Sequence, residues 1–231
     1  MTCTVTVRDL DALGEAAWDF RTSSAQWQHP HGFGMGAGWD PFPAYRHDYA
    51  EASATVLAAA AKCPPLYNIT LYLADREDKG RTNGWSHLDK HHYGDEGWLG
   101  VIMLLGKRIP PHPGITRHLA AHEYGHHAEW MLNMARGAKT PHSNDVAAEY
   151  MRVRGLPPGS SHHGEGGTWH DSVHEIFACD FRILVCGAEP EYWPHPGVPR
   201  PGDVPGLDRW WADAVSEIGA AAGGTGSVTL T

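Results

Sequence analysis

The chain has few cysteines and few basic residues for its length. Its 231 residues include four Cys, and 18 Lys and Arg stand against 27 Asp and Glu, which gives a formal net charge of −9 with His neutral. The cysteines form no Cys-x-x-Cys pair, so no disulfide framework is expected and a cytoplasmic location is predicted. Nucleic-acid binding is disfavoured because it needs clustered Lys and Arg.

Long apolar runs are also missing. No stretch approaches the ~20 apolar residues that span a bilayer, and residues 1–9 lack the basic region and apolar run of a signal peptide. We therefore expect no membrane partner. The 42% hydrophobic content and the ten Trp predict instead a protein that buries a core, while 27 Gly and 17 Pro indicate many loops.

The length suits a single domain. We expect it to span residues 1–222, with a helical and loop part at 1–65, a catalytic core at 66–186, a wrapping segment and terminal helix at 187–222, and a flexible tail at 223–231. The wrapping segment is rich in Pro and Gly. These residues punctuate regular structure, so the segment is expected to be irregular before its final helix.

Two strands and three helices are predicted within the core. Residues 66–73 alternate in period two and residues 98–105 form a short apolar run, which indicates two strands. Residues 116–135 are expected to form a helix capped by Thr116 and stopped by Gly137. Another helix is expected at 146–154, and a further one from Thr168 or Asp171 to about residue 185. The order predicts an α+β fold, in which a small mixed sheet packs on the helix at 116–135.

That helix carries the sequence His122-Glu123-Tyr124-Gly125-His126, a His-Glu-x-x-His motif. Residues four apart share one face of a helix, so both imidazoles can reach one ion. Glu123 lies beside the first histidine, close enough to act on a water bound to that ion. A helix with surface histidines would show the same spacing, but the apolar neighbours of the motif argue for a buried site.

A catalytic zinc ion needs a third protein ligand and one open position. The favoured candidate is Glu175, in a helix whose apolar positions form a packing stripe. A carboxylate beside such a stripe is costly without a cation or metal as partner. His174 and Asp171 remain alternatives, and His174 has the better intrinsic ligand chemistry.

The sequence resembles the gluzincin metallopeptidases, in which a glutamate on a second helix completes the His-Glu-x-x-His site. Residues 175–181, Glu-Ile-Phe-Ala-Cys-Asp-Phe, are similar to the Glu-x-Phe-Ala-x-x-Phe pattern of lethal-factor-like and related small zinc peptidases. The resemblance implies a zincin-like fold, zinc (Zn²⁺) at His122, His126 and Glu175, and Glu123 as general base.

The sequence departs from that family pattern at two positions. Thermolysin-like members have an aspartate four residues after the third ligand, where this chain has Cys179. Lethal-factor-like members have a tyrosine that stabilises the oxyanion at the place of Thr168. His170, Tyr150 and Tyr192 are therefore the candidates for that role.

The predicted function is hydrolysis of a peptide or protein substrate by a zinc-dependent metallopeptidase. The substrate is expected to add as an extended strand to an edge of the sheet, for which residues 98–105 are the favoured strand. One alternative is a zinc enzyme acting on a small molecule, with residues 32–38 and 159–167 narrowing the cleft. Another is a non-catalytic metal-binding domain, although the presence of Glu123 favours an enzyme.

Overall fold

The computed structural model describes residues 3–9, 47–74, 84–90, 98–105, 114–157, 169–189 and 191–223. The glycine-rich segments at 32–38 and 159–167 and the tail at 224–231, to which predictions were attached, lie outside the described residues. The described part is a mixed α+β structure with a four-stranded sheet and several helices, as predicted.

The sheet combines parallel and antiparallel pairing. Its strands are β1 (Val5–Asp9), β2 (Asn68–Ala74), β3 (Gly84–Lys90) and β4 (Trp98–Leu105), and their order is β1-β2-β4-β3. β1, β2 and β4 run parallel, whereas β3 is antiparallel to β4. The sheet is therefore mixed, and the strands predicted at 66–73 and 98–105 are confirmed as β2 and β4.

The prediction that residues 98–105 form the edge strand is wrong. β4 pairs with β2 on one side and with β3 on the other. Its continuous apolar run belongs to a central strand that is buried on both faces. Among the described strands the edges are β1 and β3, and β3 is the one that contacts the helix carrying the motif.

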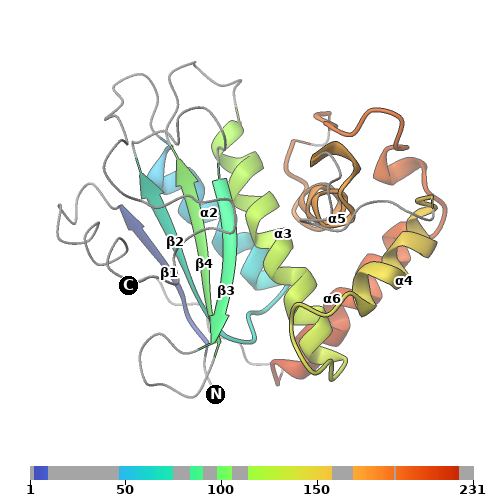
Figure 1. Ribbon diagram of the computed structural model, residues 1–231. Coiled ribbons are helices and arrows are strands. Elements are labelled where there is room, and N and C mark those ends of the chain that lie inside the picture. Colours follow the sequence, from blue (N-terminus) through green and yellow to red (C-terminus); the bar gives the residue numbers. More distant parts are fainter. Residues whose placement is uncertain are drawn as a thin grey trace.

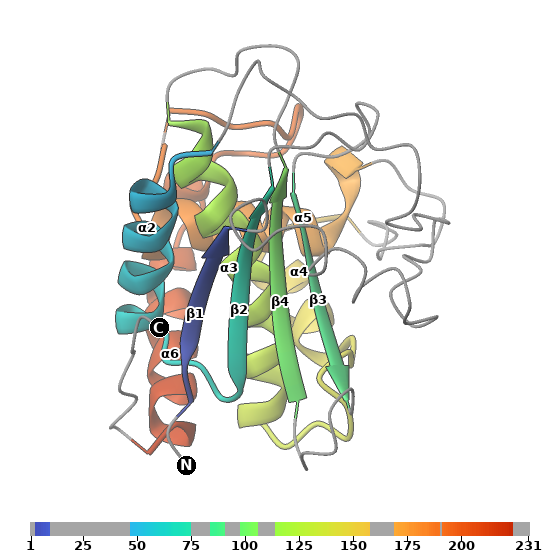
Figure 2. The same cartoon turned by 90° about the vertical axis from the view of Figure 1, so that its left-hand side faces the viewer.

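That helix, α3 (Ile115–Ala135), occupies the middle of the molecule. It packs against β3 and β4 of the sheet, and Figure 1 shows α4 (Asp145–Arg154), α5 (Val173–Asp180) and α6 (Leu207–Ala221) on its other side. Figure 2 shows α3 running behind the sheet, and α2 (Tyr49–Lys62) packs beside it. Because α3 is covered on both sides, most of its residues are buried, including polar ones.

The start of α3 differs from the prediction. The helix begins at Ile115 after Gly114, whose φ of 85° is one that glycine adopts without strain. Thr116 is therefore not the cap. Its buried hydroxyl instead lies 2.9 Å from Nδ1 of His47, just ahead of α2. The predicted end at Ala135 is confirmed, with Gly137 in the left-handed region two residues later.

The second motif helix is composite. The 3-10 turn Trp169–Asp171 precedes α5, and the chain continues from α5 into a π-helical segment, Phe181–Val185. The helix predicted from Thr168 or Asp171 to residue 185 thus begins later, at Val173. After Asp180 its backbone hydrogen bonds change from the α-helical to the π-helical pattern. Such π segments are frequent at functional sites.

α3 and α5 approach closely at Gly125. A Cβ built there would lie 2.8 Å from the Cα of Ala178 and 2.9 Å from its carbonyl oxygen. Both contacts are with backbone, so neither can be relieved by rotating a side chain. The absence of a side chain at Gly125 is what lets α5 bring Glu175 down onto the histidines of α3.

We expect Gly125→Ala to destabilise the protein. Helix propensity alone would favour Ala by about 1 kcal/mol, but overpacking costs about 1–3 kcal/mol, and the α3–α5 spacing would have to widen. Gly219→Ala in α6 is the matched control, because no described atom lies within 4 Å of its Cβ position. Thermal unfolding should show a lower Tm for the first variant and an equal or higher Tm for the second. An unchanged Tm for Gly125→Ala would contradict the close approach.

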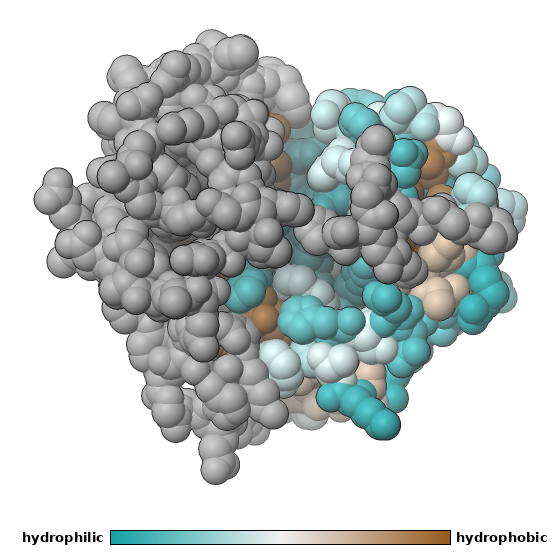
Figure 3. Space-filling model, in the orientation of Figure 1, coloured by the Kyte–Doolittle hydropathy of each residue, from teal (hydrophilic) through white to brown (hydrophobic). Residues whose placement is uncertain are grey.

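The surface of the described part is mostly hydrophilic in the view of Figure 3, with small separate apolar areas. The apolar side chains are buried inside, where all four strands and helices α2 to α6 contribute to one core cluster. None of the described helices has both the length and the apolar content needed to cross a membrane.

Candidate metal centre

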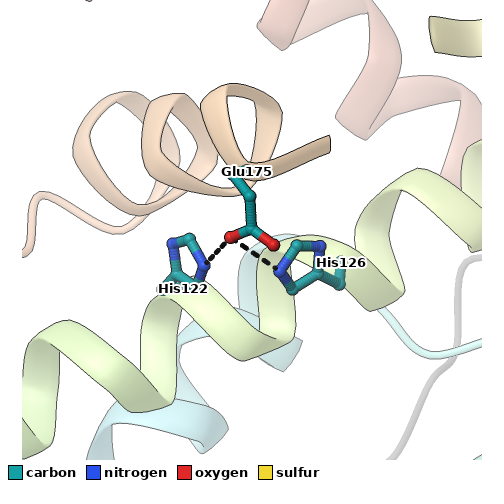
Figure 4. A group of neighbouring side chains, drawn as sticks. All are labelled: His122, His126 and Glu175. Atoms are coloured by element: carbon teal, nitrogen blue, oxygen red, sulfur yellow. Dashed lines mark hydrogen bonds and ion pairs between the residues drawn. The ribbon is translucent and has the colours of Figure 1, made fainter. Parts of the chain in front are cut away.

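Three predicted ligands meet between α3 and α5. Figure 4 shows the Glu175 carboxylate extending from α5 toward the two histidine rings on α3. Its Oε2 lies 2.9 Å from Nε2 of His122 and 3.5 Å from Nε2 of His126. The residues that are distant in sequence are thus brought together as predicted, and both histidines present the same ring nitrogen.

The group has the dimensions of a metal site. The three ligand atoms all lie within 4.8 Å of one another, and a tetrahedral zinc site with bonds of ~2.0–2.2 Å places its ligand atoms about 3.3 Å apart. His122 is 3% exposed and Glu175 is 6% exposed. A small adjustment of the side chains would place all three donors around one ion, so this group could hold a metal.

The electrostatics of the group suit a cation. Burial raises the pKa of the Glu175 carboxyl, but His126 and His122 outweigh burial and hold this pKa well below its ordinary value. The carboxylate is therefore charged in a place where water does not reach it freely. A buried negative charge of this kind is stable only with a positive partner, and a metal ion between the three side chains would supply one.

Glu123 lies beside the ligand group on α3 and faces the sheet. The hydroxyl of Ser86 on β3 lies 2.8 Å from Oε2 of Glu123 and 2.8 Å from its backbone carbonyl oxygen, so it can donate to either. Burial raises the pKa of Glu123 above its ordinary value, although His122 and His126 oppose this shift. A raised carboxyl pKa brings the group closer to the range suited to proton transfer.

The alternative third ligands are not part of the group. Nδ1 of His174 lies 2.8 Å from both carboxylate oxygens of Glu129, a residue of α3 that is 2% exposed. This pair ties α5 to α3 one residue away from Glu175. Asp171 is exposed in the 3-10 turn before α5. Of the three candidates, the described structure brings only Glu175 to His122 and His126.

The segment before α5 lies next to His122. The ring of Trp169 is 6.0 Å from the ring of His122, and its side chain is 44% exposed. His170 follows it, and Nδ1–H of His170 donates to the carbonyl oxygen of Pro194 at 2.7 Å. In this tautomer Nε2 of His170 carries no proton and can only accept a hydrogen bond. An oxyanion donor at this place would need the doubly protonated ring, and this role of His170 stays a prediction.

Tyr192 lies further along the same side. Its ring packs edge-on against His118 at 4.9 Å, and His118 in turn stacks on His122 at 6.1 Å. The side chain of Tyr192 is 42% exposed. The structure thus places Tyr192 one ring removed from the predicted ligand His122.

Tyr150 is placed in the core. Its hydroxyl donates to Asp180, which also accepts from Nε of Arg154 at 2.7 Å, and its ring packs on Phe177 and Trp210. The Tyr150 hydroxyl thus contacts the buried Arg154–Asp180 ion pair, which holds α4 to α5. The oxyanion role predicted for Tyr150 therefore has no structural support.

His127, which directly follows the predicted ligand His126, lies at the interface with the sheet. Its Nδ1 lies 3.0 Å from the hydroxyl of Tyr67 and its Nε2 lies 3.2 Å from the carbonyl oxygen of Val101. Burial lowers the pKa of His127 to about 3, so the ring is neutral. A Cβ on Gly100 would lie 2.7 Å from this ring, so glycine at that position makes room for it.

Two further contacts of the centre involve residues to which the sequence assigned no role. Ser86 contacts Glu123 from β3, a strand that was not predicted. Sγ of Cys179 lies 3.3 Å from Nδ1 of the predicted ligand His122. The position of Cys179, four residues after Glu175, was the only available signal for the second contact.

Comparison with family models, curated proteins and solved structures finds no match to this chain.

Proposed function

We propose that this protein is a zinc-dependent metallopeptidase of the gluzincin type with a zincin-like fold. The observation that carries the proposal is the meeting of Glu175 with Nε2 of both motif histidines, with Glu123 beside them. The mixed sheet packed on α3 and the ligand-bearing helix α5 agree with the architecture that the resemblance implies.

The donor set favours zinc. Two imidazole nitrogens and one carboxylate oxygen form one of the common catalytic zinc sets, which leaves a fourth position open. Sites for magnesium or calcium are built mainly from oxygen donors. No thiolate belongs to the group, since the sulfur of Cys179 lies on the opposite nitrogen of His122.

Each side chain of the site has a separate role in the proposed reaction. His122, His126 and Glu175 would hold the zinc ion, which when bound acts as a Lewis acid and lowers the pKa of the attacking water. Glu123 accepts the proton of that water and delivers it to the leaving amine nitrogen. Ser86 keeps the Glu123 carboxylate in place by donating a hydrogen bond to it.

The edge strand β3 is the surface on which we propose that an extended peptide binds. It is antiparallel to β4, lies at the edge of the described sheet and contacts α3. Strand addition there would use main-chain hydrogen bonds, and Ser86 on this strand contacts Glu123 directly. The scissile bond would then lie close to the general base.

Metal removal tests this function. The zinc-loaded protein should cleave members of a random peptide library, a strong chelator should abolish cleavage, and stoichiometric zinc should restore it. Mass spectrometry of the products gives the cleaved bonds, and magnesium in place of zinc is the control. Cleavage that persists after complete zinc removal would contradict the mechanism. A zinc-loaded protein that cleaves no peptide would contradict the proposed substrate class.

A further inference from the structure

We propose that the thiol of Cys179 positions the ligand His122 by accepting a hydrogen bond from its Nδ1–H. The proposal rests on the metal centre described above. Histidines that bind a metal generally donate their second ring N–H to a carboxylate, a backbone carbonyl or a water, which fixes the ring and raises its basicity. In this chain a sulfur atom is the group found at that nitrogen.

The two nitrogens of His122 have different partners. Nε2 lies 2.9 Å from Oε2 of Glu175, which places it on the side of the ion. A metal needs the lone pair of this nitrogen, so the proton of the neutral ring belongs on Nδ1. Nδ1 lies 3.3 Å from Sγ of Cys179, within the range of a hydrogen bond to sulfur. The thiol therefore accepts from the ligand and lies outside the ligand group.

Helix α5 supplies both partners of His122 from one face. Glu175 and Cys179 are four residues apart, so their side chains project from successive turns on the same side. Glu175 reaches the metal-facing nitrogen and Cys179 reaches the opposite one. The ring of His122 is thus held at both ends by a single helix, and its orientation depends on the placement of α5.

The wrapping segment brings His195 next to the sulfur. Cys179 is fully buried, and the ring of His195 and the guanidinium of Arg182 lie close to its thiol. Nδ1 of His195 bonds the carbonyl oxygen of His170 at 2.9 Å. Nε2 of His195 is buried and has no hydrogen-bond partner among the described residues.

Arg182 holds the same segment by donating hydrogen bonds to the segment's backbone carbonyl oxygens. Its guanidinium donates to the carbonyl oxygens of Ala188 at 2.5 Å, Glu189 at 2.7 Å and Tyr192 at 2.7 Å. The segment that carries His195 is therefore fixed to Arg182 by hydrogen bonds as well as by packing.

Zinc affinity tests the proposal. Cys179→Ala should weaken zinc binding by about 10–100-fold, the usual loss when the partner of a ligand is removed. Cys179→Ser keeps an acceptor and should recover most of this loss. Cys186→Ala, at the half-buried cysteine seven residues later, is the matched control and should bind like wild type. Affinity is measured by competition with a chelator of known zinc affinity, and thermal unfolding of the metal-free variants shows whether each is folded.

Cobalt substitution adds a readout that a purely structural role would not change. The wild-type cobalt protein should show ligand-field bands without a thiolate-to-cobalt charge-transfer band. Those bands should shift in Cys179→Ala and return in Cys179→Ser. A charge-transfer band that disappears in Cys179→Ala would make Cys179 a ligand and overturn the proposal. Zinc affinity of a folded Cys179→Ala protein within about threefold of wild type, far below the expected loss, would also overturn it.

A second measurement decides the matter if Cys179→Ala does not fold. Nitrogen-15 NMR of the zinc-loaded wild-type protein should show zinc on Nε2 of His122 and an exchange-protected proton on Nδ1. Zinc on Nδ1 would overturn the proposal. Neither readout uses hydrolysis. A protein that binds zinc but cleaves no peptide would therefore contradict only the proposed peptidase activity. Normal zinc binding by Cys179→Ala would contradict only the proposed role of the thiol.

Discussion

Glu123→Gln is expected to retain zinc and to lose peptide hydrolysis by about 10²–10⁴-fold, the usual contribution of a general base. The amide has the same shape as the carboxylate, and its oxygen can still accept the hydrogen bond from Ser86. It has no basic site at neutral pH, so it cannot take the proton of the attacking water. The loss should appear in kcat with little change in KM, because the substrate contacts are unchanged.

Glu217→Gln is the matched control for this variant. Glu217 lies on α6 with 41% of its side chain exposed and pairs with Arg136, so the same chemical change there should leave hydrolysis intact. Zinc content of all three proteins is determined by elemental analysis of the purified samples. Full activity of a zinc-loaded Glu123→Gln protein would remove Glu123 from the mechanism.

Glu175→Ala should weaken zinc binding by more than about 10²-fold, beyond the loss expected for a residue that only supports a ligand. Two neutral imidazoles remain in this variant, and the charged donor is gone. Chelator competition gives the affinity directly. Because a ligand that binds only the folded protein raises its stability, zinc should increase the Tm of wild type and have much less effect on the Tm of Glu175→Ala.

Two further variants are measured beside Glu175→Ala, one as a control and one to test the alternative ligand. Glu149→Ala removes a surface carboxylate that pairs with Arg136 and should bind zinc as wild type does. His174→Ala separates the competing ligand, since His174 is paired with Glu129 and should leave most of the zinc affinity in place. If Glu175→Ala bound zinc like wild type while His174→Ala did not, the third ligand would be His174.

The predicted features that the structure shows depend on short-range patterns. The spacing of His122 and His126 places them on one helical face whatever the rest of the fold does. The bounds of β4 follow from an uninterrupted apolar run, and the end of α3 follows from Gly137. Glu175 was predictable because a carboxylate beside an apolar stripe needs a positive partner.

The missing strand shows where such patterns fail. Residues 84–90, Gly-Trp-Ser-His-Leu-Asp-Lys, contain one Gly, one Asp and one Lys, so their composition resembles a loop. They form β3 because β4 offers them an antiparallel partner. Without β3, the sequence could not show that β4 is central or that Ser86 contacts Glu123.

The side chains that pair with residues of α5 could not be predicted from local sequence patterns either. Tyr150 and His174 carry functional groups that suit catalysis or metal binding, and only tertiary packing directs them to Asp180 and Glu129 instead. Cys179 could be aligned with the family aspartate, yet its contact with His122 depends on the close approach of α3 and α5 at Gly125.

The most direct test of the central claim is a crystal structure of the zinc-loaded protein with anomalous data on both sides of the zinc absorption edge. The account predicts one zinc ion, bonded at ~2.0–2.2 Å to Nε2 of His122, Nε2 of His126 and a carboxylate oxygen of Glu175, with a fourth position open toward Glu123. An ion held by other residues, or no anomalous peak between α3 and α5 in zinc-saturated crystals, would contradict it.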